Sequence, residues 1–170
     1  MAALPRRLAV AVVGFAGADQ TRTVVGWQRV SDERGAAALA DQIADAFPIT
    51  WSECGGLTAV GEAIAWSLWE LARNAYDGMA EIDVSGDGSN SQGEDLTAAR
   101  DRAVATGVPI NRLAIINEET RLAEYYQRKV IGGLGAFVLT AVDHTSFALA
   151  IRLKLLRELA PRPVAARGDG

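Results

Sequence analysis

Oxygen-bearing side chains gather between residues 80 and 93, where a short apolar run gives way to turn-forming residues. Asp83 and Asp87 carry carboxylates, and Ser85 carries a hydroxyl between them. Carboxylate, hydroxyl and water oxygens are the ligands that a hard divalent cation prefers. In open α/β sheets, ligands bind beyond the carboxyl ends of the strands, which is where this loop would lie. The stretch therefore predicts a divalent-cation site, although a solvated turn rich in Gly, Ser and Asn would have the same composition.

A calcium-binding loop is a second interpretation of the same residues. The spacing of an EF-hand loop is matched by Asp83, Ser85, Asp87, Gly88, Ser91 and Glu94. However, Ile82 and Val84 have the pattern of a strand, so the incoming helix of an EF-hand is missing. Asn90 also stands where such loops usually carry an apolar residue. The spacing therefore favours a strand-to-loop cation site over an EF-hand.

Thr58 is the other residue whose position could matter to this chemistry. It follows Gly55 and Gly56 and precedes an amphipathic segment, so its hydroxyl could cap a helix. Alternatively, the hydroxyl could turn towards a cation held by Asp87, if both loops meet at the same edge of the sheet. The candidate metal ligands are Thr58, Asp83, Ser85 and Asp87. The ion that these ligands predict is Mg²⁺ or another divalent cation.

Hydrolytic chemistry is the alternative function for these residues. Asp83 at the end of a strand could attack a phosphate ester, with Asp87 beside a metal ion. Such sites usually carry a second acid two residues further on to protonate the leaving group, and Ser85 occupies that position here. His144 beside Cys54 or a serine would make another catalytic pair, but a lone histidine near a helix start is more typical of a cap. The residue types thus favour a chain without enzymatic activity.

Bulk composition indicates one globular domain. The chain has 170 residues, of which 49% are apolar and 22% charged, with a formal net charge of −4. No basic stripe interleaved with aromatic residues points to nucleic acid, and the single cysteine excludes an internal disulfide. Residues 8–15 follow two arginines and resemble a signal peptide, but they also fit a buried strand. No other segment is long and apolar enough to span a membrane. Location stays open between the cytoplasm for the chain as written and export for a longer one.

Hydrophobic periodicity predicts alternating strands and helices. We expect a domain over residues 1–160 and a flexible tail over 161–170. Strands are expected at 8–15, 21–30, 79–85, 108–116 and 136–142, and helices at 31–47, 58–73, 95–106, 118–130 and 145–159. The first two strands are close enough for a hairpin, and Ser31 should cap the helix after them. The later alternation favours an α/β fold with a mostly parallel sheet and helices on both faces.

Several runs resemble the DUF1194 family of bacterial proteins, which is von Willebrand factor type A-like. The resemblance is carried by residues 9–17, 24–27, 82–90, 108–115, 125–126 and 130–138, and it extends from about residue 8 to 159. It implies a Rossmann-like sheet with a metal-ion-dependent adhesion site at its edge, where three loops meet a Mg²⁺ ion. Thr58 matches the second loop, and Asp87 with Gly88 matches the third. Such modules are not enzymes, and they bind a protein partner whose acidic group completes the shell of the ion.

The first loop of that site, Asp-x-Ser-x-Ser, has no counterpart in this position of the sequence. The resemblance therefore implies a family member lacking the first, central strand and the first helix, together with most of the cation ligands. We expect weak cation binding, and a sheet that is weakened, rearranged or completed by another chain, including by self-association through its edges. A degenerate fragment without a retained site is the remaining alternative.

Overall fold

Strands and helices alternate along the described chain, as an α/β fold requires. The computed structural model describes residues 8–46, 56–115 and 122–141. Its elements are β1 (Leu8–Gly14), β2 (Arg22–Val30), α1 (Glu33–Ala46), α2 (Val60–Arg73), β3 (Ile82–Gly86), α3 (Leu96–Ala105), β4 (Ile110–Ile115), α4 (Leu122–Lys129) and β5 (Val138–Ala141). The predicted helix at 145–159, the tail, Cys54 and His144 lie outside the described residues, so the predictions about them stay predictions.

The N-terminal part is the predicted hairpin. β1 and β2 pair antiparallel, with Leu8 opposite Val30 and Gly14 opposite Arg22. α1 packs against β2. The capping prediction for this helix was wrong, because the carboxylate of Asp32 and not Ser31 accepts a hydrogen bond from the backbone nitrogen of Gly35 at 2.8 Å. An aspartate with two oxygens satisfies an unpaired helix amide as well as a serine does, so sequence alone does not separate the two neighbours.

β3, β4 and β5 form a parallel sheet in that order. Because each crossover steps one strand in the same direction and parallel crossovers are right-handed, α3 and α4 fall on one face of this sheet. One core holds residues of α2, α3 and α4 with the inward residues of β3 and β4, including Ile64, Val84, Ile110 and Tyr126. The amphipathic character predicted for the segment after Thr58 is confirmed in α2, since Val60 and Ile64 are fully buried in this core. That helices cover the second face as well stays a prediction.

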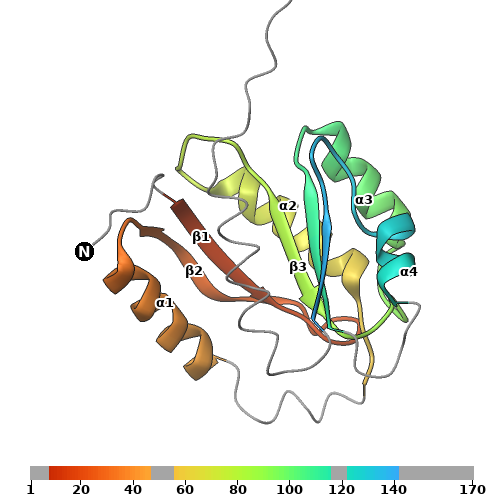
Figure 1. Ribbon diagram of the computed structural model, residues 1–170, viewed down its shortest axis with the longest axis horizontal. Helices are drawn as coiled ribbons and strands as arrows, with labels where there is room; N and C mark the ends of the chain where they lie inside the picture. Colours follow the sequence, from red (N-terminus) through yellow and green to blue (C-terminus); the bar gives the residue numbers. More distant parts are fainter. Residues whose placement is uncertain (1–7, 47–55, 116–121, 142–170) are drawn as a thin grey trace, which may run out of the picture.

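The hairpin and the parallel sheet are two separate sheets in the described part of the chain. α2 contacts both β1 and β3 and so links the two sheets (Figure 1). The ends of the two strands approach each other, because a Cβ placed on Gly86 would lie 4.0 Å from the Cζ atom of Phe15. We refer to this region, between Phe15 just after β1 and Gly86 at the end of β3, as the seam. None of the described helices is both long and apolar enough to cross a bilayer.

Candidate functional site

Two loops meet beyond the carboxyl end of β3. The segment before α2 is bonded to the loop that follows β3, which runs from Asp87 to Asp95. The Thr58 carbonyl accepts hydrogen bonds from the backbone nitrogens of Ser91 at 2.8 Å and Gln92 at 3.2 Å. The Thr58 nitrogen donates to the Ser91 hydroxyl at 2.9 Å. Backbone bonds of this kind fix the register of the two loops, so Thr58 and the loop that carries Asp87 lie at one edge of the sheet.

The Thr58 hydroxyl does not cap α2. The N-cap position of α2 is Ala59, and no side chain at that position bonds the helix. Instead, Asn90 from the other loop accepts a hydrogen bond from the Gly61 nitrogen at 3.0 Å. The Thr58 hydroxyl lies against the backbone of the opposite loop, because a Cβ on Gly88 would stand 2.7 Å from its oxygen. Gly88 therefore permits a close approach that places this hydroxyl beside the residue following Asp87.

The other predicted ligands are spread along β3. Asp83 and Ser85 are exposed, and they alternate with the buried Ile82 and Val84, as side chains of a strand must. Asp87 is also exposed, in the loop beyond the strand. Across the residues that the structure describes, no three histidine, cysteine or acidic side chains gather closely enough to hold a metal ion. Of the four predicted ligands, Thr58 and Asp87 are the two in the loops that meet at Gly88, which is fewer ligands than a closed divalent-cation centre needs.

The EF-hand interpretation is contradicted by the structure. Residues 82–86 form β3, so no helix leads into the loop. Glu94, which would be the bidentate ligand at the end of such a loop, instead forms an ion pair with Arg102 at 2.5 Å. Asp95 begins α3 by accepting a hydrogen bond from the Ala98 nitrogen at 2.8 Å. The acidic end of this loop therefore serves the start of α3.

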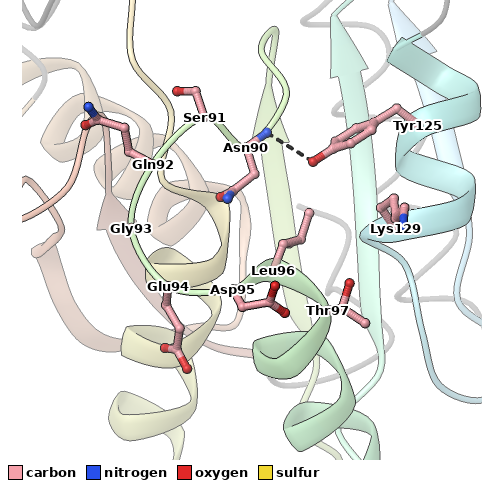
Figure 2. A pocket seen from close by; sticks show the side chains of 10 residues that line it. All are labelled: Asn90, Ser91, Gln92, Gly93, Glu94, Asp95, Leu96, Thr97, Tyr125 and Lys129. Carbon is pink, nitrogen blue, oxygen red and sulfur yellow. Dashed lines mark hydrogen bonds between the residues drawn. The ribbon is translucent and has the colours of Figure 1, made fainter.

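Two tyrosines of α4 hold the loop after β3 from its other side. The Tyr126 hydroxyl donates to the Gly88 carbonyl at 2.5 Å. The Tyr125 hydroxyl accepts from the Asn90 nitrogen at 3.2 Å (Figure 2). The two tyrosines are adjacent residues of one short helix, so both hydrogen bonds tie the loop to α4. The sequence analysis did not assign the tyrosines this role.

Arg112 is a residue that the sequence analysis missed. It lies on β4 opposite Val84, and its side chain is completely buried. The guanidinium carbon stands 3.7 Å from the centre of the Tyr126 ring. Burial lowers the pKa of Arg112, while Tyr126, Tyr125 and Asp87 act in the opposite direction. A signal was present, because Ile110 belongs to the core face of β4 and the residue two positions later must share that face.

An open polar pocket of about 450 Å³ lies between the loop after β3 and α4. It is lined by Asn90, Ser91, Gln92, Gly93, Glu94, Asp95, Leu96, Thr97, Tyr125 and Lys129. In Figure 2, Tyr125 and Lys129 form one wall, and the loop and the first turn of α3 form the others. The pocket offers polar contacts next to the loops, whereas the Asp95 carboxylate on its floor is engaged in capping α3.

Comparison with known proteins gives one family. No curated protein matches the chain. A family model described as "Protein of unknown function (DUF1194)" matches residues 1–163. This match covers almost all of the 170 residues, including both loops of the candidate site. The chain therefore belongs to the DUF1194 family.

Proposed function

We propose that this chain is a non-enzymatic binding module of von Willebrand factor type A character, which meets a protein partner with the loops beyond β3. The observation that carries the proposal is the bonding of the Thr58 segment to the loop containing Asp87 and Gly88. Two loops fixed to each other at the carboxyl edge of a parallel sheet form the kind of surface on which α/β folds bind ligands. In a Rossmann-like sheet of this type, the antiparallel hairpin and the parallel strands would lie on either side of a central strand.

A divalent cation could assist this binding only weakly. Thr58 and Asp87 would hold it, with Asp83 and Ser85 as the further predicted ligands, and water or a partner carboxylate would fill the other positions. The ion would supply a positive charge that attracts an acidic group. The buried Arg112 already carries a positive charge that interacts with Asp87, so the local field opposes a second cation. The described residues therefore fit a partial site and not a resident metal centre.

Calorimetric titration with Mg²⁺ tests the cation part of the proposal. We expect binding weaker than micromolar, lost in Asp87→Ala and reduced in Thr58→Val. Asp77→Ala removes an exposed carboxylate that lies outside both loops, so this control should bind Mg²⁺ as the unaltered chain does. Micromolar Mg²⁺ binding that survives Asp87→Ala would show that the ligand assignment is wrong.

Two further measurements test the binding function itself. The immobilised chain should retain a protein from an extract of its own source cells, and Asp87→Ala should retain less of it than Asp77→Ala does. Equal retention by both variants would place the binding surface elsewhere. The alternative is a metal-dependent hydrolase using Asp83 and Asp87. It predicts turnover of a generic phosphate ester that disappears in Asp83→Asn, and that result would replace our proposal.

A further inference from the structure

Arg112 lacks the partners that a buried arginine normally has. Its exposed fraction is 0%, and none of its three guanidinium nitrogens makes a hydrogen bond within the part of the chain that the structure describes. The Tyr126 ring covers one face of the guanidinium, with the ring centre 3.7 Å from the guanidinium carbon. Burying a charge in this way is costly unless an opposite charge and hydrogen-bond acceptors accompany it. Asp87 interacts electrostatically with this charge, but within the described residues the guanidinium has no hydrogen-bond acceptor.

The guanidinium reaches the seam between the two sheets. A Cβ on Gly86 would lie 3.2 Å from Nη2 of Arg112 and 4.0 Å from Cζ of Phe15. Gly86 has no side chain, so at this point only its backbone stands beside the guanidinium. No strand of the described residues lies between β1 and β3. An anion would therefore reach Arg112 through the seam.

The surroundings favour a carboxylate over a phosphate. One guanidinium carries a single positive charge, which one carboxylate neutralises through two parallel hydrogen bonds. A phosphate monoester near neutral pH carries a charge of about −1.5 to −2 and would leave excess negative charge buried between Phe15 and Tyr126. A carboxylate is also planar and small, which suits a position beside a glycine that presents no side chain.

We propose that the seam is a receptor for an aspartate or glutamate side chain of the partner protein, whose carboxylate pairs with Arg112. This inference rests on the proposed binding function and names the group that the partner offers. It differs from that proposal in one respect, because the acid meets an arginine of this chain and needs no metal ion.

The experiment uses the full chain in the presence of EDTA. The probes are N-acetyl-aspartyl amide and its matched neutral control, N-acetyl-asparaginyl amide. The readout is the ¹H–¹⁵N resonance of the Arg112 side-chain Nε, which is assigned by its absence in Arg112→Met. We expect the aspartyl compound to shift this resonance saturably, about tenfold more tightly than the asparaginyl compound and than inorganic phosphate. Equal shifts with the asparaginyl compound, with phosphate or with chloride at the same ionic strength would overturn the inference, as would no shift at all.

Two pairs of variants test whether the carboxylate binds at Arg112 and through the seam. Arg112→Met should abolish the binding measured by calorimetry, whereas Arg128→Met removes an exposed arginine of α4 and should leave it intact. Gly86→Ala should weaken binding because its Cβ crowds Nη2, whereas Gly26→Ala, a strand glycine with no neighbour within 4 Å, should not. Circular dichroism and thermal unfolding confirm that each variant is folded.

The same data separate this inference from the proposed function. Carboxylate binding that requires Mg²⁺ and survives Arg112→Met would mean that the acid meets a cation. The inference would then be wrong, and the proposed cation-assisted function would stand. Binding to Arg112 in EDTA, together with failure of every Mg²⁺ titration, would uphold the inference and remove the cation from the proposed function.

Discussion

Arg112 and Tyr126 form the closest link between the buried charge and the candidate site. The guanidinium carbon lies 3.7 Å from the centre of the tyrosine ring, and the hydroxyl of the same ring donates to the Gly88 carbonyl at 2.5 Å. One tyrosine thus contacts the arginine with its face and the loop with its edge. A change in the pairing of Arg112 would therefore change the position of Tyr126 and its hydrogen bond to Gly88. The Thr58 hydroxyl lies against Gly88.

Replacing Arg112 with methionine should leave the isolated chain as stable as before or more stable. Methionine fills much of the same volume without a charge, so the desolvation penalty disappears, although the contact with the Tyr126 ring is lost. We expect the free energy of unfolding in urea to be unchanged or raised by up to about 4 kcal/mol. A loss of more than about 1 kcal/mol relative to Arg128→Met would show that Arg112 is already paired in the isolated chain.

Removing the Tyr126 hydroxyl should loosen the loop after β3. Tyr126→Phe keeps the ring over Arg112 but deletes the donor to the Gly88 carbonyl, which should cost about 0.5–1.5 kcal/mol. Amide exchange of residues 87–93 should rise at the same time. Tyr125→Phe is the matched variant, because it removes the acceptor of the Asn90 nitrogen from the adjacent position of α4. If neither variant changes exchange in the loop, the two tyrosines do not hold it.

Gly61 and Gly35 should respond in opposite directions to alanine. Both lie in helices, where alanine is normally favoured by about 0.5–1 kcal/mol. A Cβ on Gly61 would stand 2.2 Å from the backbone oxygen of Glu94, whereas a Cβ on Gly35 meets nothing closer than 3.5 Å. We expect Gly61→Ala to destabilise the chain by about 1–3 kcal/mol because the backbone of the loop must shift. Chemical unfolding measures both changes, and a stabilising Gly61→Ala would contradict the packing of α2 against this loop.

Asn90 should stabilise α2 from outside the helix. Asn90→Ala removes the acceptor of the Gly61 nitrogen, and the loss of a helix cap costs about 1 kcal/mol. Ser89→Ala changes the preceding residue of the same loop, for which the structure records no side-chain hydrogen bond, and should be neutral. Urea unfolding of the two variants gives the comparison. Equal stabilities would mean that water caps the Gly61 nitrogen as well as Asn90 does.

Periodicity predicted the regular elements because local spacing determines which face of a segment is apolar. The hairpin, the apolar face of α2 and the parallel strands were all predicted with boundaries within a few residues. Val60, Ile64, Leu68 and Leu71 illustrate the reason, since their helical spacing alone predicts a buried stripe. The resemblance to DUF1194 was confirmed by the family match. Whether Thr58 and Asp87 hold a cation stays a prediction.

Features that depend on distant contacts escaped the sequence analysis. Thr58 has the residue type of a cap, yet Asn90, 29 residues from Gly61, caps the helix. Nothing in the sequence marks Gly61, yet the loop at Glu94 leaves no room for a side chain there. Arginine is a residue type that usually lies on the surface. Only the alternation of side chains along β4, in which Arg112 shares a face with Ile110, could have predicted that it is buried. In each case the deciding neighbour arrives from another part of the chain, which local propensity cannot register.

The capping of α2 by Asn90 has a consequence for how the chain acquires its structure during translation. Residues 60–73 leave the ribosome before residue 90 does, so the nascent helix begins with an amide that has no protein acceptor. Its first turn should remain frayed until β3 and the loop beyond it have been synthesised. The last step in forming the N-terminal end of this helix is thus a tertiary event, and Asn90→Ala should mainly speed unfolding while leaving the refolding rate nearly unchanged.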